Sequence, residues 1–237
     1  SDETMVKTAA ELRYSETAFV SIMGDNEFRT RYFTPVAEVA LCGHATVGAF
    51  CALAHLGVIK KEDTCINHTM AGDLEIEVGD GYVMMDMATP KEILTISDED
   101  SLRELYSVLG AQYEKTTGLL PEIISTGLPD IIVPLPSKEA LNAITPNMKA
   151  LAALSERYKV VGVYAFSIAT EENLTAHTRD FAPLYDIDEE AATGTSSGAL
   201  TYYLYKNHLI ENNSEVIFLQ GEAMGRPSEI KATLCFS

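Results

Sequence analysis

Two segments of the chain combine residue types that could bind a small anion. Residues 42–49 read CGHATVGA, and residues 192–199 read ATGTSSGA. In both, glycine with threonine or serine stands just before an apolar run, which is typical of a helix N-terminus. The unpaired N–H groups of such a terminus suit a carboxylate or phosphate. The segments could hold one anion together, or they could be two ordinary capped helices whose glycines allow close packing.

Glu16 and His44 have the residue types that move a proton between carbons beside a carboxylate or ketone. Such a reaction needs a base, an acid and a site that stabilises the developing negative charge. Glu16 stands between a polar turn and an apolar strand, where it could act as the base. His44 could relay or donate a proton near neutral pH. Glu16 could equally be a capping or strand-end charge, and His44 a helix-cap or core histidine.

The two glycine-bearing segments belong to a longer repeat. Residues 31–35 (RYFTP) and then Glu38 precede the first, and residues 179–183 (RDFAP) and then residues 189–190 (EE) precede the second. The order and the offset are nearly constant, which predicts two similar halves that face each other, with the site in the crevice between them. The arginine of each copy is expected to have a matching role in its strand, either supporting the sheet or binding substrate.

Composition excludes several classes of partner. The 237 residues include 35 acidic and 17 basic ones, for a formal net charge of −18. This charge opposes binding to nucleic acid or to anionic membranes. No stretch approaches the ~20 apolar residues that span a bilayer, and the first residues lack the features of a secretory signal. We expect a cytoplasmic protein whose partner is a small anionic substrate.

The cysteines and histidines predict neither disulfides nor a metal site. Cys42, Cys51, Cys65 and Cys235 show no C-x-x-C motif and no partner histidine at metal-ligand spacing, so we expect free thiols in a reducing compartment. The chain also has no G-x-G-x-x-G after a strand and no P-loop. No metal and no cofactor are expected.

Hydrophobic periodicity predicts strands alternating with helices, and two central apolar helices over residues 47–58 and 199–205. We expect an α+β fold of two similar domains, each a mixed sheet or open barrel around a central helix. The domains are residues 1–112 and 113–237, joined by a polar connector over residues 112–120, and the last strand could return to the first half. Further helices are predicted at residues 2–13, 98–109 and 147–158, and strands at residues 17–23, 27–33, 74–78, 82–87, 122–126, 130–135, 159–169, 174–181, 215–219 and 229–235.

Five ordered motifs resemble the PhzF-like family of phenazine-biosynthesis-type isomerases. The resemblance implies a diaminopimelate epimerase-like fold, a homodimer, and proton transfer on a small carboxylate without a cofactor. The motifs cover essentially the whole chain: residues 11–19, residues 31–35 with Glu38 and residues 42–46, residues 125–129, residues 179–199, and residues 220–222 with 225–228.

The resemblance also implies site residues. The catalytic glutamate of the S-E-[ST] motif falls on Glu16 and the histidine of the G-H motif on His44. Where the family reads E-D-P-A-T-G-S this chain reads EEAATGT, so the acidic site residue falls on Glu190 and Ala191 replaces a proline. These departures affect the placement of the Glu190 carboxylate, and a misplacement of about 1 Å can lower the rate of a reaction about 100-fold. The residues expected to bind substrate are Gly43, Ala45, Thr46, Gly194, Thr195 and Ser196, and none is expected to bind metal.

Two alternative functions remain open. In racemases of this fold two cysteines act as a pair, at positions matching Cys42 and Ala192; the second thiol is missing here, which places a racemase or epimerase below the isomerase. The other alternative is a catalytically degenerate ligand-binding member. Family members begin with a strand before the first helix, and this chain starts within that helix. We therefore expect either that residues are absent from the sequence shown or that the protein is a natural truncation.

Overall fold

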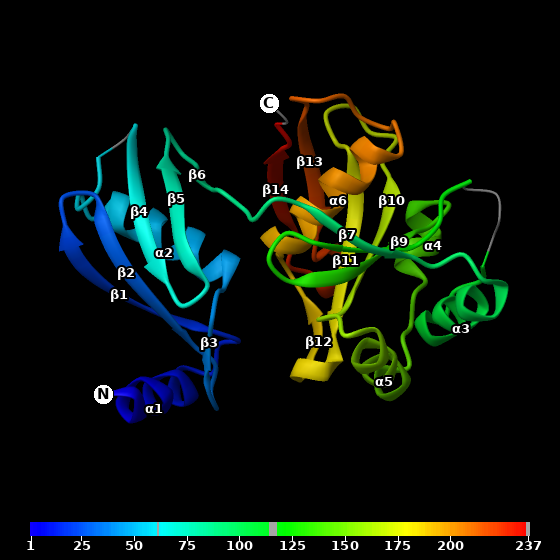
Figure 1. The fold of residues 1–237 in the computed structure, drawn as a ribbon, viewed down its shortest axis with the longest axis horizontal. Helices are drawn as coiled ribbons and strands as arrows, with labels where there is room; N and C mark the ends of the chain where they lie inside the picture. Colours follow the sequence, from blue (N-terminus) through cyan, green and yellow to red (C-terminus); the bar gives the residue numbers. More distant parts are fainter. Residues whose placement is uncertain (61, 114–117, 236–237) are drawn as a thin grey trace. The chain divides into compact units, whose positions relative to one another are not determined.

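The computed structural model describes residues 1–60, 62–113 and 118–235. The chain forms two compact units, Ser1–Met87 and Ala88–Ser237 (Figure 1). Each unit contains one mixed β-sheet and its own hydrophobic core. Within the described residues, no helix is long and apolar enough to cross a membrane.

The first unit consists of a curved sheet, one central helix and an N-terminal helix. The strands pair in the order β1-β2-β4-β5-β6, and β3 pairs with β2. The core contains Phe28, Phe50 and Ile76. The elements are α1 (Asp2–Leu12), β1 (Thr17–Gly24), β2 (Glu27–Phe33), β3 (Glu38–Val39), α2 (Gly43–His55), β4 (Asp63–Thr69), β5 (Gly72–Val78) and β6 (Val83–Met85).

The second unit is larger and has helices on both sides of its sheet. The strands pair in the order β14-β13-β11-β10-β9-β8-β7, and β12 pairs with β11. The elements are β7 (Lys91–Thr95), α3 (Glu99–Leu109), β8 (Glu122–Ser125), β9 (Pro129–Pro134), α4 (Lys138–Asn142), α5 (Met148–Tyr158), β10 (Val163–Ile168), β11 (Ala176–Ala182), η2 (Pro183–Tyr185), β12 (Ile187–Glu190), α6 (Gly194–Lys206), β13 (Glu215–Gln220), η3 (Glu222–Met224) and β14 (Ser228–Thr233).

The sequence repeat is a structural repeat. In the first unit, β1 and β2 are antiparallel, β2 and β4 are parallel, and β4 and β5 are antiparallel. In the second, β10 and β11 are antiparallel, β11 and β13 parallel, and β13 and β14 antiparallel. The central helices α2 and α6 occupy the corresponding parallel crossovers, which need a long connection of this kind. The prediction of two similar halves is confirmed.

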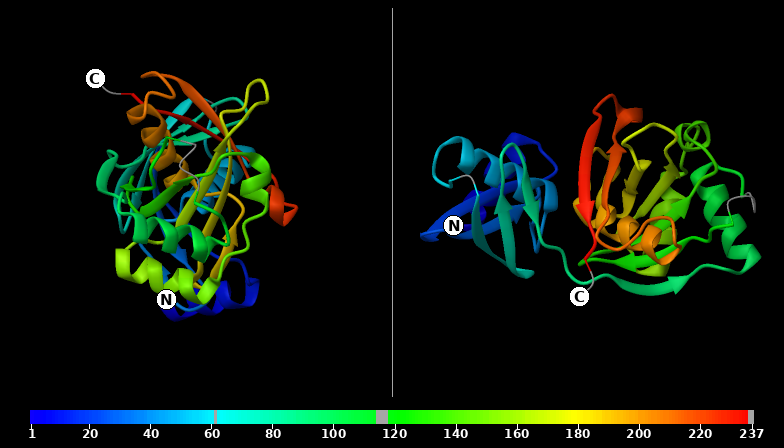
Figure 2. Two further views of the ribbon diagram at one scale, coloured as in Figure 1. Left: turned by 90° about the vertical axis from the view of Figure 1, so that its right-hand side faces the viewer. Right: turned by 90° about the horizontal axis from the view of Figure 1, so that it is seen from above.

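Each sheet curls around its central helix, as predicted. α2 contacts β1, β5 and β6, which include both ends of its sheet, and α6 contacts β8, β9 and β14. Figure 2 shows α6, in orange, enclosed by the strands of the second unit. The α+β class and the arrangement of sheet around helix are therefore as the sequence indicated.

Two boundary expectations differ from the observed units. The predicted boundary between residues 112 and 113 lies within the second unit, because β7 pairs with β8 and α3 contributes Leu102 and Leu105 to the core that contains Ile123. The last strand, β14, pairs with β13 in the same sheet and does not return to the first half. The connection through η3 is short, so the pairing of β14 with β13 costs less conformational entropy than a pairing with a strand far away in the sequence would. Residues 114–117 of the predicted connector lie outside the described residues.

Candidate functional site

Glu16 and His44 lie together in the first unit. Glu16 immediately precedes β1, and His44 is the second residue of α2. Oε2 of Glu16 is 3.5 Å from Nε2 of His44, and the side chains are 13% and 35% exposed. The pair is therefore sheltered and still reachable from solvent. A carboxylate and an imidazole at this separation have the geometry of a shared acid–base site.

The buried oxygen of Glu16 has no hydrogen-bond partner within the described residues. Oε2 lies at ion-pair distance from His44, but this contact does not meet the geometry of a hydrogen bond. Leaving a buried polar atom unpaired costs about 1–3 kcal/mol, and more for a charged group. Such atoms are rare in folded proteins, and a catalytic role is one reason they persist. The oxygen is thus available to accept a proton or to bind a ligand.

Cys42 forms a cluster with these two residues. Its Sγ is 3.6 Å from Nδ1 and 3.8 Å from Nε2 of His44, and the residue is buried. One ligand atom from each of Glu16, Cys42 and His44 lies within 4.8 Å of the other two. The sequence prediction had not joined the thiol to Glu16, because only the packing of β1 against α2 brings them together. The available signal was the C-x-H spacing of Cys42 and His44.

The first turn of α2 leaves its N–H groups without a capping side chain. Cys42 is the N-cap residue in extended conformation, no side chain of the described residues caps the helix, and the first turn has no acidic residue. The Thr46 hydroxyl donates to the carbonyl of Cys42 at 2.7 Å and contacts the hydroxyl of Tyr32 at 2.5 Å. The start of the helix is held by contacts of its own residues, and its uncapped positive end, beside His44, is of the kind that suits an anion.

The first turn of α6 repeats this construction in the second unit. Thr193 is the N-cap residue, again without a capping side chain among the described residues and without an acidic residue in the first turn. The Ser197 hydroxyl donates to the carbonyl of Thr193 at 2.8 Å and contacts the hydroxyl of Tyr164 at 2.9 Å. Both central helices therefore begin at the glycines that the sequence indicated, each with the same internal support.

Two buried carboxyl groups lie beneath the start of α6. Asp130 accepts hydrogen bonds from the Ser196 hydroxyl at 2.7 Å and from the N–H of Gly162 at 3.0 Å. Asp180 accepts one from the Thr193 hydroxyl at 2.5 Å. Burial raises the pKa of Asp130 to about 6. Burial, and then the charge of Asp130, raise the pKa of Asp180 well above its usual range.

The sequence analysis missed this pair of aspartates. The signal that could have found it is an aspartate inside a buried strand, since Asp130 precedes four buried residues of β9 and Asp180 stands between buried residues of β11. The two carboxyl groups hold the residues from which α6 starts.

Glu190 lies at the end of β12 and is half-buried. Its carboxylate accepts a hydrogen bond from the N–H of Ala191 at 3.3 Å, and its carbonyl accepts one from Nε2 of Gln220 at 2.8 Å. Directly after Gln220 comes Gly221, whose φ is 81°. A side chain at this position would clash with the carbonyl of Arg226. The segment that carries Glu190 is therefore held closely. Its predicted role together with Glu16 and His44 stays a prediction.

The residues expected to bind substrate differ in accessibility. Gly43, Ala45 and Gly194 are half-buried, whereas Thr46, Thr195 and Ser196 are buried. The hydroxyls of Thr46 and Ser196 are bound to Cys42 and Asp130. The N–H of Thr46 also donates to the carbonyl of Cys42, at 2.9 Å. Thr46 therefore supports the start of the helix, and of these two residues only Ser196 could meet an anion through its backbone N–H.

The arginines of the repeat support their sheets in the same way. Arg31 forms a two-point ion pair with Glu38, at 2.7 and 2.6 Å, and its guanidinium lies 5.0 Å from the ring centre of Phe33. Arg179 forms the same pair with Glu189, at 2.9 and 2.8 Å, and lies 4.9 Å from Phe181. Arg179 also donates to the carbonyls of Leu141 and Ile144. Of the two expected roles, the structure shows support of the sheet.

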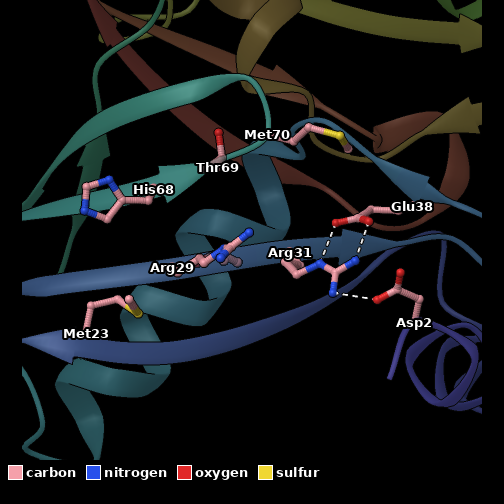
Figure 3. Close-up of a pocket in the computed structure, with 9 residues that line it drawn as sticks. Asp2, Met23, Arg29, Arg31, Glu38, His68, Thr69 and Met70 are labelled. Atoms are coloured by element: carbon pink, nitrogen blue, oxygen red, sulfur yellow. Dashed lines mark hydrogen bonds and ion pairs between the residues drawn. The ribbon is translucent and has the colours of Figure 1, made fainter.

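A surface pocket of about 560 Å³ lies elsewhere on the first unit. Figure 3 shows Arg31 in it, bonded to both Glu38 and Asp2. His68, also on its wall, is paired with Asp73 and Glu27, whose hydrogen bonds raise its pKa. Neither Glu16 nor the start of α2 lines this pocket. Because several of its charges neutralise one another, this pocket is a weaker candidate site than the cluster of Glu16, Cys42 and His44.

The chain matches known proteins over nearly its whole length. A family model described as phenazine biosynthesis-like protein matches residues 1–235. An isomerase of Deinococcus radiodurans, itself named as uncharacterized, is 35% identical over 237 residues, which cover 97% of this chain and 76% of that protein. Trans-2,3-dihydro-3-hydroxyanthranilate isomerase of Pseudomonas aeruginosa is 31% identical over 235 residues, which cover 98% of this chain and 80% of that protein.

Solved structures confirm the predicted fold. A phenazine biosynthesis protein of the PhzF family from Bacillus anthracis superposes with a TM-score of 0.84 at 26% identity, covering 98% of this chain and 80% of that one. A hydroxyproline epimerase from Agrobacterium vitis gives a TM-score of 0.61 at 13% identity, covering 93% of this chain and 66% of that one, and shows the fold alone.

Proposed function

Because the chain belongs to the phenazine biosynthesis-like (PhzC-PhzF) family, we propose that it is an isomerase that moves a proton between carbons of a small carboxylate substrate. The relatives named as isomerases support the reaction class. The observation that carries the mechanism is the buried Glu16 oxygen, which has no hydrogen-bond partner within the described residues and lies 3.5 Å from Nε2 of His44.

In this mechanism Glu16 takes a proton from a carbon of the substrate and returns it to another carbon. A positioned base of this kind contributes about 10²- to 10⁴-fold to the rate. His44 can exchange the proton with the carboxylate, since its Nε2 lies 3.5 Å from the same oxygen. The negative charge that develops on the substrate during this transfer must be stabilised by hydrogen-bond donors that are already positioned around it.

The start of α2 supplies that stabilisation. Its uncapped first turn, with no acidic residue of its own, lies beside His44. The N–H groups of residues 43–45 would bind the carboxylate of the substrate and the charge that spreads onto it. A metal or organic cofactor has no step in this scheme, and the sequence has none of the common nucleotide-binding motifs.

The names of the relatives and this charge pattern support a proposal for the substrate class. One relative is named for its action on trans-2,3-dihydro-3-hydroxyanthranilate, a small carboxylate. We propose the same class for this chain: a carboxylate with a hydroxyl or a double bond beside the carbon that loses the proton. That compound is the first probe, followed by other 3-hydroxy and 2,3-unsaturated carboxylates.

The test is turnover of this panel by the purified protein in the presence of a chelator. We expect one compound to be isomerised, and Glu16→Gln to lower kcat by at least about 10². The matched control is Glu11→Gln, an exposed glutamate of α1, which should leave kcat unchanged. No turnover across the panel, in a protein shown to be folded, would favour the degenerate ligand-binding alternative.

A racemase or epimerase that uses Cys42 is the second candidate. The observation in its favour is the contact of the Cys42 thiol with both ring nitrogens of His44, at 3.6 and 3.8 Å. Ala192 stands where the second half would need another thiol. A one-thiol racemase would need a different group as its second base, so we place this reaction below the isomerase.

A further inference from the structure

We infer that Glu16, Cys42 and His44 form a binding site for a zinc-type divalent metal ion, and that an ion bound there blocks the acid–base site. Nothing in the family resemblance assigns a metal to this chain, and the sequence predicted none. The binding half of the inference stands on geometry and ligand chemistry alone. Only the inhibitory half rests on the proposed function.

The distances within the cluster are close to those of a tetrahedral zinc site. Zn–S bonds of about 2.3 Å and Zn–N or Zn–O bonds of about 2.0–2.1 Å separate sulfur from nitrogen by about 3.5 Å and nitrogen from oxygen by about 3.3 Å. Here Sγ of Cys42 is 3.8 Å from Nε2 of His44, and Nε2 is 3.5 Å from Oε2 of Glu16. Shifts of a few tenths of an ångström would bring both separations to those values. Because the sulfur is also 3.6 Å from Nδ1, the imidazole ring must in addition turn about its Cβ–Cγ bond until the lone pair of Nε2 points at the ion.

The third separation needs a larger adjustment. The ligand atoms of Cys42 and Glu16 lie within 4.8 Å of each other. The Glu16 side chain has several rotatable bonds, and its free Oε2 is not held in place by a hydrogen bond from the described residues. The carboxylate can therefore move toward the sulfur without breaking a hydrogen bond of that oxygen with the described residues.

The unpartnered Glu16 oxygen is an independent indication of a ligand. It is buried, and it lacks a hydrogen-bond donor among the described residues. A cation at the centre of the cluster would compensate it directly, as buried charges are compensated by a partner or by a metal. The same ion would bind the Cys42 sulfur, which already faces His44.

The ligand set selects the type of ion. Thiolate, imidazole and carboxylate are the three ligands typical of zinc sites in proteins, and three protein ligands leave a fourth position for water. Hard ions such as Mg²⁺ and Ca²⁺ prefer oxygen-only sites. One thiolate and one carboxylate neutralise the double charge of the ion. The partly exposed His44 gives access from solvent, and the net charge of −18 favours the approach of cations.

Binding would occur without any redox change. The Cys42 thiol loses its proton to solvent as the sulfur–metal bond forms. The lone pair of a His44 nitrogen and one Glu16 oxygen then also bind the metal. These are the groups that the proposed mechanism uses to accept and hold the substrate proton, so the loaded site cannot perform the transfer.

The direct test is a titration of the full chain with Co²⁺, which substitutes for Zn²⁺ and reports a thiolate ligand by an intense near-ultraviolet charge-transfer band. We expect the band in the unchanged protein, its displacement by Zn²⁺, and its absence in Cys42→Ser. Glu16→Gln and His44→Asn should each weaken Co²⁺ binding by at least about 10-fold, as loss of a direct ligand costs no less than loss of an outer-shell partner.

The matched control removes the competing thiol on the same helix. Cys51 is exposed and lies one turn before the exposed His55 on α2, so this pair could bind metal weakly by itself. Cys51→Ser should leave the band unchanged. A band that survives Cys42→Ser, that disappears in Cys51→Ser, or that is missing at millimolar Co²⁺ would overturn the site. So would equal affinity in Glu16→Gln, His44→Asn and the unchanged protein.

Inhibition is measured separately, on the substrate that the panel identifies. Zn²⁺ should abolish turnover at the concentration that displaces Co²⁺, and a chelator should restore it. Full activity of the zinc-loaded protein would overturn the inhibitory half. Failure of the whole panel would count against the proposed function alone, because the cobalt titration does not depend on turnover.

Discussion

Cys42 is the residue whose role separates the two candidate reactions. If Glu16 is the base, the thiol takes no proton from substrate, and Ala192 offers no second thiol for a pair. We expect Cys42→Ala to leave turnover in chelator-treated protein within a few-fold of the unchanged enzyme. A loss of about 10² or more, the size of a general acid–base contribution, would place the racemase ahead.

The buried aspartates of the second unit predict an unusual pH dependence of stability. Burial raises the pKa of Asp130 to about 6, against about 3.9 in an unfolded chain. The folded state therefore holds more protons than the unfolded state between about pH 4 and 6, and this contribution to the free energy of unfolding falls as pH rises through that range. It is fully present only below about pH 4.

Asp130→Asn removes this contribution. The asparagine amide can still accept a hydrogen bond from the N–H of Gly162 through its oxygen, and its NH₂ group can donate one to the Ser196 hydroxyl. The difference in unfolding free energy between variant and unchanged protein, measured by urea titration, should rise in favour of the variant between about pH 4 and 6. The exposed Asp188→Asn is the control. A difference that stays flat or falls over that range would contradict a protonated Asp130.

The two arginine ion pairs predict unequal stability effects from equivalent elements. Arg179 and Glu189 have side chains 10% and 14% exposed, whereas Arg31 and Glu38 are 27% and 25% exposed. Arg179→Met would remove the Arg179 donor from Glu189 and from the carbonyls of Leu141 and Ile144, although the Leu141 carbonyl keeps the N–H of Ile144. We expect a loss of about 3–5 kcal/mol in unfolding free energy. Arg31→Met, at the same place in the repeat, should cost clearly less. Equal losses in urea unfolding would show that burial does not set the difference.

The elements that the sequence predicted are those with a strong local signal. The starts of α2 and α6, the β1–β2 hairpin and the amphipathic α3 and α5 follow from glycine positions and hydrophobic period. β4 was missed because its buried face carries the polar Asn67, which is hydrogen-bonded to Thr30 and Tyr32. A polar residue at a buried position interrupts the alternation of apolar and polar residues by which a strand is recognised. β7 is mostly exposed, and its pairing with β8 is a non-local contact that periodicity does not report.

The members of the candidate site were predictable in part, for the same reason. The motif resemblance indicated Glu16 and His44, and the fold places them 3.5 Å apart. The thiol of Cys42 could not be added from sequence, because Glu16 and Cys42 meet only when β1 packs against α2. Asp130 and Asp180 were hidden for a related reason: their partners Ser196 and Thr193 come from the start of α6, far along the chain.

For the whole molecule, the excess of acidic residues predicts a dependence of stability on salt. A formal charge of −18 destabilises the compact state through self-repulsion. Raising the ionic strength from about 0.01 to 0.15 M shortens the screening length from about 30 to 8 Å, so we expect Tm to rise. NaCl and KCl should act alike, since the effect is screening. An unchanged or lower Tm in differential scanning calorimetry would show that local ion pairs outweigh the net charge.

The central claim is that Glu16 carries a proton between substrate carbons, and deuterium uptake measures this most directly. The isomerised compound of the panel is incubated in D₂O with chelator, and the product is analysed by mass spectrometry. Because the partly exposed His44 can exchange the proton of Glu16 with solvent before it is returned, we predict deuterium at the carbon that gains the proton, with Glu16→Gln abolishing the uptake and Glu11→Gln leaving it intact. Uptake that survives Glu16→Gln would contradict the account.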